Sequence, residues 1–214
     1  MRNFLHAHPD IFQTLNREEL IEVVLFLQKL AGEFENASRH DHLTGLRNRR
    51  GFEEKARAKL ESRNHGHWHH RKAEEISVAL LFVDIDHFKK INDKHGHSHG
   101  DEVLQVISET IKRSVRSDDI DIVGRWGGEE IVVCLPGMDS CSAAKKAEAI
   151  RASIAELSFM SEEGNFGVTV SIGICSTEEV GYDLGRLEKA ADKALYKAKR
   201  GGRNRVVLYA SPKN

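Results

Sequence analysis

The chain has 214 residues, a formal net charge of -1 at pH 7 and a hydrophobic content of 40%. This length allows one globular domain with an appendage, and the near-zero net charge argues against a nucleic-acid partner, which requires a broad basic surface. The sequence contains no Gly-x4-Gly-Lys-Ser/Thr motif, which excludes a P-loop nucleotide site.

The three cysteines are few, unclustered and odd in number: Cys134, Cys141 and Cys175. This usage is typical of reduced thiols in a cytoplasmic protein. No apolar run reaches the roughly 18 residues of a membrane span, and the N-terminus lacks the apolar core of a signal peptide. We therefore expect a soluble, cytoplasmic protein without a membrane span.

Residues 1–38 are predicted to form an N-terminal helical segment. A capping box between Asn16 and Glu19 would begin the helix. Apolar residues then recur at spacings of four, three, four and three, namely Leu20, Val24, Leu27, Ala31 and Phe34. This seam suits either packing on the chain's own domain or pairing with a second copy in a parallel dimer, and about two heptads are too few to decide.

A helix is expected at residues 49–63, and a histidine-rich stretch follows it. Four histidines lie among residues 65–70. They could bind zinc, but no acidic or cysteine ligand is interleaved with them and the stretch has loop character. An exposed loop is the simpler interpretation.

An apolar run at residues 76–83 ends in the acids Asp84 and Asp86. Such a run is typical of a fully buried central strand, and ligands of open α/β sheets bind just beyond strand ends. Asp84 and a glutamate from a neighbouring hairpin could share one Mg²⁺ ion, which prefers carboxylate, water and phosphate oxygens. The structural alternative is that Asp84 ends the strand and Asp86 caps the next helix. That explanation suffices for Asp86 but not for Asp84.

Two helices are predicted next, at residues 88–93 and 101–115, with Gly96 and Gly100 on either side of a turn. The second helix has one apolar face. Three alternating histidines fall in the turn: His95, His97 and His99. The glycines favour a tight turn over a metal site.

A hairpin is predicted from two β-rich runs, residues 120–123 and 131–135, on either side of Gly127 and Gly128. A two-residue turn needs positive φ angles, which glycine adopts freely. Glu129 and Glu130 follow the glycines. They are either solvated acids at a strand edge or ligands that converge on the same site as Asp84.

The remaining elements are a helix at 143–157, a buried strand at 168–175, a helix at 184–199 and a strand at 205–209. Lys199 and Arg203 lie at the cationic end of the last helix. Helix termination explains these charges, and so does binding of phosphate oxygens. The order of elements predicts an α/β (α+β) domain with a central mixed sheet flanked by helices, because the hairpin makes neighbouring strands antiparallel.

Six blocks, in order, resemble the GGDEF family of diguanylate cyclases. They lie at residues 41–52, 84–93, 96–101, 125–130, 168–173 and 191–204, and they include Asp84-Ile-Asp-His-Phe-Lys and Arg125-Trp-Gly-Gly-Glu-Glu. The resemblance covers residues 39–209, which implies an N-terminal segment (1–38), a GGDEF domain (39–209) and a tail (210–214). It also implies a fold like that of the nucleotide cyclases and the polymerase palm.

The resemblance implies that two GTP molecules, one on each subunit of a homodimer, are condensed into cyclic di-GMP with release of two pyrophosphates. Asp84, the carbonyl of Ile85 and Glu129 would bind Mg²⁺ or Mn²⁺. Glu129 would also accept the proton of the attacking hydroxyl, although a metal-bound carboxylate is a poor base and loss to water is an alternative. Glu130 would be a second ligand or an orienting group.

Other residues would bind the substrate by the same resemblance. Asn92 and Asp101 would bond the guanine edge, whose N1 and N2 donors adenine lacks. His97 would lie near the nucleotide, and the main-chain N–H groups of Phe88 and Lys89 would bind phosphate oxygens. Gly127 and Gly128 would let the backbone approach the nucleotide closely. Lys199 and Arg203 would contact the triphosphate.

The chain departs from the family at two places. Ile131 replaces the phenylalanine that usually ends the signature, for which we expect a packing adjustment and retained activity. The product-inhibition motif, Arg-x-x-Asp, would place its acid at Asp121 but finds Asp118 where arginine belongs. Arg116 and Asp119 spell the motif two residues too early, so the site is either shifted by an insertion or weakened, and we favour weakening.

Three alternatives remain for function. A catalytically silent GGDEF domain would bind GTP or cyclic di-GMP and act through a partner, but the intact acids argue against it. A metal-responsive interaction protein would use the histidine-rich stretch at 65–70. A related dinucleotide cyclase would accept ATP.

Overall fold

The computed structural model describes residues 16–37, 39–61 and 76–211. By its internal contacts the chain divides into two compact units, residues 1–38 and 39–214. The predicted histidine-rich stretch at 65–70 lies outside the described residues. None of the helices in the described ranges combines the length and the apolar composition that a membrane span requires.

The first unit contains helix α2 (Arg17–Ala37). The capping box predicted at its start is confirmed, because the Asn16 side chain accepts from the N–H groups of Glu18 and Glu19, and the Glu19 carboxylate accepts from the Asn16 N–H. Five large apolar side chains of α2 are exposed: Ile21, Val24, Leu25, Phe26 and Leu27. The helix thus displays apolar surface that suits a protein partner.

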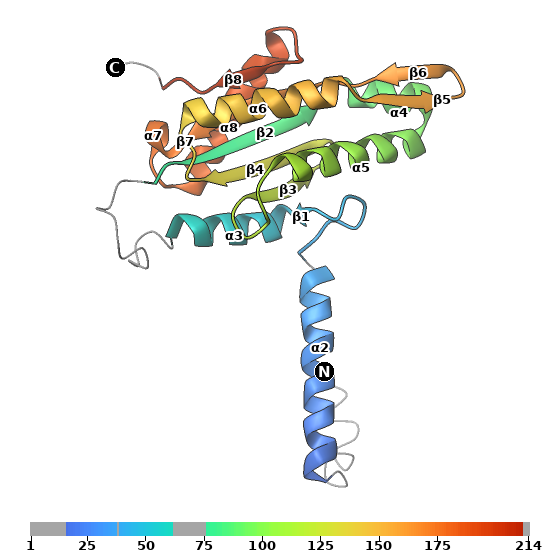
Figure 1. Ribbon diagram of the computed structural model, residues 1–214, viewed down its shortest axis with the longest axis vertical. Helices are drawn as coiled ribbons and strands as arrows, with labels where there is room; N and C mark the ends of the chain where they lie inside the picture. Colours follow the sequence, from blue (N-terminus) through green and yellow to red (C-terminus); the bar gives the residue numbers. More distant parts are fainter. Residues whose placement is uncertain (1–15, 38, 62–75, 212–214) are drawn as a thin grey trace. The chain divides into compact units, whose positions relative to one another are not determined.

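The second unit is built on a six-stranded mixed sheet in the order β1-β3-β4-β2-β7-β8 (Figure 1). Its strands are β1 (Arg47–Asn48), β2 (Val78–Ile85), β3 (Ile122–Gly127), β4 (Glu130–Pro136), β7 (Val170–Ser176) and β8 (Val206–Leu208). The central strand β2 is antiparallel to both β4 and β7, whereas the outer pairs β1–β3 and β7–β8 are parallel. The predicted mixed sheet with a buried central strand is confirmed.

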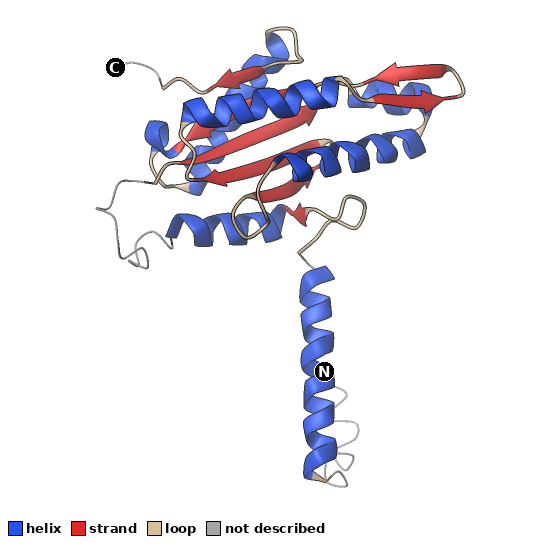
Figure 2. Ribbon diagram, in the orientation of Figure 1, coloured by secondary structure: helices blue, strands red, loops and turns tan. Residues whose placement is uncertain are grey.

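Helices cover both faces of this sheet (Figure 2). On one face, α3 (Arg49–Glu61) and α8 (Leu184–Arg200) pack on Leu80 and Phe82 of β2; on the other, α5 (His97–Ser114) and α6 (Ser140–Ala155) pack on Leu81 and Val83. Alternation along β2 sends successive side chains to opposite faces. Each fully buried apolar side chain of this size contributes roughly 1.5–3 kcal/mol to folding, so the end of β2 rests on a rigid core.

Glycine allows α8 to lie directly against the sheet. A Cβ atom added to Gly173 of β7 would come within 2.1 Å of the Leu195 main-chain nitrogen and 2.2 Å of the Ala191 carbonyl oxygen. No side chain fits there. This close approach fixes the last turns of α8 next to the end of β2.

Several short elements have no counterpart in the sequence predictions. They are β1, the separate hairpin of β5 (Ser158–Ser161) and β6 (Gly164–Gly167), and the one-turn helix α7 (Thr177–Val180). Each is too short for hydrophobic periodicity to reveal it. The Glu-Glu-Gly sequence at 162–164, with Gly164 at φ 105°, was the local signal for the hairpin turn.

The turn predicted between Gly96 and Gly100 is wrong in its length. Helix α4 (Phe88–His95) is capped by Gly96, and α5 begins immediately afterwards at His97, so Gly100 lies inside a helix. Gly96 alone, at φ 88°, makes the break between the two helices. His97 and His99 therefore lie in the first turn of α5.

Candidate functional site

The end of β2 brings carboxylates from two strands together. In the β2–β4 pairing Asp84 lies directly opposite Glu130, and on its other side it lies opposite Ser171 of β7. The Asp84 side chain is only 7% exposed, and one of its oxygens, Oδ2, lies 2.6 Å from the Nζ of Lys199. Directly opposed residues of adjacent antiparallel strands have their side chains close together, so the register alone places these two acids at one site.

Glu129 reaches the same site through the β3–β4 hairpin. The hairpin was predicted correctly, but its turn lies one residue later than the glycine pair, at Gly128 and Glu129, because Gly127 still pairs with Glu130. Gly128 has a φ of 48°, and Gly127 is not among the residues with positive φ. Trp126 is the extra residue where the register shifts. Glu129 thus lies in the turn itself.

Arg125 holds this turn in place. Its guanidinium donates to the carbonyl oxygen of Gly128 through Nε at 3.0 Å and through Nη2 at 2.8 Å. Its Nη1 donates to both carboxylate oxygens of Asp41, and the Asp41 carboxylate also accepts from the main chain and the hydroxyl of Thr44. No separate role for Asp41 or Arg125 was predicted from the sequence, although both lie in blocks that resemble the family.

Aromatic side chains pack against the β3–β4 hairpin. The Trp126 ring meets Phe52 of α3 and Phe82 of β2 in edge-to-face geometry, with centroid distances of 6.3 and 5.2 Å. The Arg49 guanidinium lies over the Trp126 ring at 4.2 Å. Contacts of this kind fix ring orientation as well as burying area, so the bulge is anchored to two other elements.

Two acids at this site, Asp84 and Glu130, have raised pKa values. Burial raises the pKa of the Asp84 carboxyl, and Lys199 opposes that effect while the charges of Glu129 and Asp86 add to it. Burial also raises the pKa of Glu130, to which the charges of Asp84 and Glu129 contribute. Like charges gathered at a partly buried strand end are typical of functional sites, and a divalent cation would relieve their repulsion.

The donors present suit Mg²⁺ or Mn²⁺. Among the described residues, no three side chains of the His, Cys, Asp and Glu type surround a common metal position. Mg²⁺ does not need such a cage, because it is usually held by one or two carboxylates together with water and substrate phosphate. Asp84, Glu129 and the main-chain carbonyl of Ile85 are oxygen donors of the type that would hold such an ion.

Asp86 does not cap a helix as predicted. Its buried carboxylate accepts from the hydroxyls of Thr169 and Ser171, both at 2.7 Å, and from the N–H of Asn204 at 2.9 Å. The residue that precedes α4 is His87, which has a φ of 59° and makes no side-chain capping bond. The prediction failed because local spacing could not show that β7 and the loop before β8 would supply closer donors.

That loop carries Arg203, one of the predicted phosphate ligands. Arg203 and Asn204 have φ angles of 62° and 44°, which are uncommon for residues other than glycine. The Asn204 N–H donates to Asp86, and its side-chain oxygen accepts from Arg151 at 2.6 Å. Strained backbone that is held by surrounding contacts is characteristic of binding loops.

Helices α4 and α5 carry the predicted guanine ligands. Asn92 lies in α4 and Asp101 in α5, and a Cβ atom on the intervening Gly100 would lie only 1.9 Å from the Asn92 amide oxygen. The Asn92 side chain therefore lies against the turn of α5 that leads into Asp101. Phe88 and Lys89 are the first two residues of α4, where main-chain N–H groups have no partner within the helix.

The predicted product-inhibition residues form a separate cluster. Arg116 donates to the Asp121 carboxylate through its side chain and its main chain, and also to the carbonyl of Pro136. The Asp121 side chain is fully buried. Asp118, at the position expected for arginine, pairs with Arg47 and Lys55, while the Asp119 side chain is 98% exposed.

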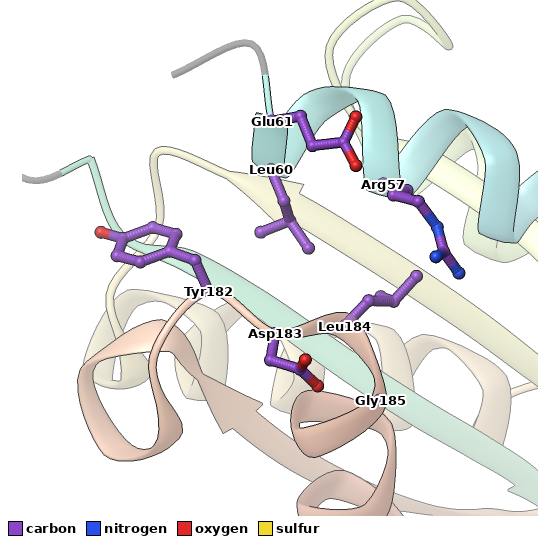
Figure 3. Close-up of a pocket in the computed structure, with 7 residues that line it drawn as sticks. All are labelled: Arg57, Leu60, Glu61, Tyr182, Asp183, Leu184 and Gly185. Atoms are coloured by element: carbon purple, nitrogen blue, oxygen red, sulfur yellow. The ribbon is translucent and has the colours of Figure 1, made fainter. Parts of the chain in front are cut away.

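A pocket of about 290 Å³ lies away from these acids, between the end of α3 and the start of α8 (Figure 3). Leu60 and Leu184 line its floor, and Tyr182 beside it donates to the Ile76 carbonyl just before β2 begins. Asp183 already accepts from the Arg186 N–H as a helix cap. The pocket lies at the opposite end of β2 from Asp84, so it is not part of the cluster of acids.

Comparisons with known proteins agree with the fold. The family model described as "Diguanylate cyclase, GGDEF domain" matches residues 38–205. The diguanylate cyclase DgcM of Escherichia coli K12 is 40% identical over 180 residues, which make up 84% of this chain and 40% of that protein. The chain thus spans less than half the length of this curated relative.

Two solved structures are also similar. The coiled coil and GGDEF domain of DgcB from Caulobacter crescentus, in complex with c-di-GMP, superposes with a TM-score of 0.76 at 29% identity, covering 89% of this chain and 96% of that one. The active GGEEF domain of a diguanylate cyclase from Vibrio cholerae gives a TM-score of 0.67 at 32% identity, covering 77% of this chain and 97% of that one.

Proposed function

Because the chain belongs to the GGDEF family of diguanylate cyclases, we propose that it condenses two molecules of GTP into cyclic di-GMP and releases two pyrophosphates. The observation that carries this proposal is the pairing of Asp84 with Glu130 at the end of β2, with Glu129 in the adjoining turn. An active relative whose signature reads GGEEF supports activity with glutamate in the turn.

The residues around the acids would bind and orient the nucleotide. Lys199 and Arg203 would contact the triphosphate, and the N–H groups of Phe88 and Lys89 would cradle phosphate oxygens. The Asp101 carboxylate would accept from the N1 and N2 donors of guanine, and Asn92 would hydrogen-bond to the same edge, which selects GTP over ATP. Gly127 and Gly128 would leave room for the nucleotide beside the hairpin.

The acids would serve the phosphoryl transfer. Asp84, the Ile85 carbonyl and Glu129 would hold Mg²⁺ or Mn²⁺, whose charge offsets that on the transferring phosphoryl group and lowers the pKa of the attacking 3′-hydroxyl. Glu129 would accept the proton of that hydroxyl, directly or through water. Glu130, which lies opposite Asp84, would be an orienting group or a second carboxylate ligand of the metal ion.

Two subunits would have to face each other, since each GTP supplies the hydroxyl that attacks the other. The similar structure of DgcB includes a coiled coil ahead of its GGDEF domain. Helix α2, with its exposed apolar side chains, would supply the equivalent contact in a homodimer. Cyclic di-GMP, the compound bound in that DgcB structure, would be the product released here.

The direct test is to incubate the purified protein with GTP and Mg²⁺ and to identify products by chromatography and mass spectrometry. Glu129→Ala should abolish cyclic di-GMP, whereas Glu162→Ala, an exposed position in the β5–β6 turn, should not. When GTP and ATP are supplied together, only the product formed from GTP should be detected. Measurable GTP binding without product over a wide range of protein concentration would instead identify a silent nucleotide-binding domain.

A further inference from the structure

Lys199 occupies the carboxylate that the metal ion needs. Its Nζ lies 2.6 Å from Oδ2 of Asp84, and this is the ion pair that Asp84 makes in the described part of the chain. Lys199 is also the residue proposed to contact the triphosphate. A divalent cation and the ammonium group would compete for the Asp84 carboxylate, so the contact of Lys199 with Asp84 and its proposed contact with a phosphate would belong to two states of the site.

Charge balance explains why the lysine is held there. Asp84 is buried, and the charges of Glu129 and Asp86 act on it unfavourably. Asp86 is satisfied by two hydroxyls and a main-chain N–H, none of which carries a formal charge. A buried carboxylate without a counter-charge is costly, and Lys199 supplies that charge when no metal is bound.

A metal ion and an ammonium group on one carboxylate repel each other. A divalent cation that binds Asp84 would therefore weaken its bond to Lys199. The lysine can leave without any movement of α8, because its side chain is 33% exposed at the last turn of the helix and is long and flexible. Arginine, which would bond a carboxylate through a rigid two-pronged fork, would exchange less readily.

We propose that Lys199 is an exchangeable counter-ion: it neutralises Asp84 in the metal-free protein, is displaced when the divalent cation binds, and is then free to contact the triphosphate of GTP. This inference rests on the proposed function for the identity of the nucleotide. It adds that metal binding and nucleotide binding strengthen each other through one side chain. By linkage, the nucleotide must raise the affinity for the metal by the same factor.

The decisive measurement is the affinity for Mn²⁺ without nucleotide, by titration calorimetry at pH 8.5, where protons compete least for Asp84. Lys199→Met removes the competing ammonium and should bind Mn²⁺ more tightly than the wild type, by about fivefold or more. Lys197→Met, an exposed position on the same helix turn, makes the same change in net charge and should bind like the wild type. Equal Mn²⁺ affinity in the two methionine variants overturns the proposal.

Lys199→Arg keeps the charge and is the second test. It should bind Mn²⁺ no more tightly than the wild type, and tighter binding would overturn the proposal even if Lys199→Met failed to fold. The effect on nucleotide binding is measured with 3′-deoxy-GTP, which lacks the attacking hydroxyl and cannot react. Lys199→Met should bind this nucleotide more weakly than the wild type does. Added Mn²⁺ should also increase the affinity for the nucleotide less in Lys199→Met than in the wild type. Unaltered binding and coupling would contradict the exchange.

The metal and nucleotide results separate the two proposals. If the wild type bound no 3′-deoxy-GTP and formed no product, the proposed cyclase function would fail, yet the Mn²⁺ comparison would still decide whether Lys199 competes for Asp84. If product forms but Lys199→Met gains no affinity for Mn²⁺, the cyclase function stands and the exchange is wrong.

Discussion

Arg125 and Asp41 form a paired hydrogen bond in which one guanidinium nitrogen lies 3.0 and 3.1 Å from the two carboxylate oxygens. They are 84 positions apart in the sequence. Because the same guanidinium also donates to Gly128, it joins the segment that leads into β1 to the turn that contains Glu129. The position of the proposed general base therefore depends on a residue near the start of its unit.

Asp41→Asn should lower cyclase turnover and reduce the free energy of unfolding by about 1–3 kcal/mol, since it weakens charge-assisted hydrogen bonds. Burial would raise the pKa of Asp41, but Thr44 and Arg125 together hold it below 3.8, so this stability is present above pH 3.8 and is lost as pH falls through the lowered value. Urea unfolding and product assays measure both effects. Glu54→Gln, which removes exposed ion pairs, should leave both stability and turnover nearly unchanged, because exposed pairs are screened by solvent.

Glu130→Gln should stabilise the metal-free protein at neutral pH. The pKa of Glu130 is raised above 4.5 in the folded state by burial and by Asp84, so the folded state binds its proton more tightly than the unfolded state. Stability must then fall as pH rises from 4.5 through the raised pKa, and the glutamine variant escapes that loss. Urea unfolding from pH 4 to 8 without divalent ions should show a difference that grows with pH. A difference that shrinks, or an equal trend in Glu162→Gln, would contradict the assignment.

Asp86→Ala should destabilise the fold by about 2–4 kcal/mol and raise the KM for GTP. The change leaves the buried Ser171 hydroxyl and the Asn204 N–H without their acceptor and releases the loop that contains Arg203. Thr169→Val removes only one of the three hydrogen bonds and should cost about 1 kcal/mol. Thermal unfolding and steady-state kinetics compare the two variants. A KM that is unchanged in Asp86→Ala would mean that Asp86 does not position the loop.

Gly100→Ala should weaken GTP binding by about tenfold, equivalent to about 1.4 kcal/mol, while the protein remains folded. The new Cβ would lie 1.9 Å from the Asn92 amide oxygen and must push that side chain away from the guanine site. Gly185→Ala, in the first turn of α8, meets nothing closer than an Asp183 oxygen at 3.4 Å and serves as the matched control. The affinity of the two variants for 3′-deoxy-GTP, measured by calorimetry, distinguishes them. Equal affinities would show that Asn92 does not bind guanine.

Product inhibition should be weak, because Arg116 is already bonded to Asp121 and the expected arginine position holds Asp118. Arg116→Ala should act on stability instead, costing about 3–5 kcal/mol by leaving a buried carboxylate without its counter-charge. Calorimetric titration with cyclic di-GMP and urea unfolding test both statements. Tight product binding that Arg116→Ala abolishes would show that the shifted motif forms a working inhibitory site.

The sequence predicted the long elements of the fold well. Strand β2, helix α8 and the β3–β4 hairpin follow from a continuous apolar run, helical spacing and a glycine turn, each of which depends on neighbouring residues alone. Strand β1 and the β5–β6 hairpin were missed. Strand β1 has two residues, and β5 and β6 have four residues each, which is too short for hydrophobic periodicity to indicate a strand.

The candidate site was predicted in part. The acids Asp84, Glu129 and Glu130 were identified from their places at strand ends, and the β2–β4 register brings the first and last of them opposite each other. The role of Asp86 was wrong. Its partners are Thr169 just before β7, Ser171 in β7 and Asn204 in the loop before β8, between 83 and 118 positions away, so no local pattern could indicate them.

The sequence by itself determined the buried faces of the long strands and helices and which acids leave the central strand, because hydrophobic periodicity and turn chemistry act between near neighbours. Only the tertiary structure decided the bonds of Asp41 with Arg125, Asp86 with Asn204 and Asp84 with Lys199. Periodicity specifies the buried face of an element but not which residue of a distant element lies opposite. That choice is made by strand register and helix packing, which depend on the whole core at once.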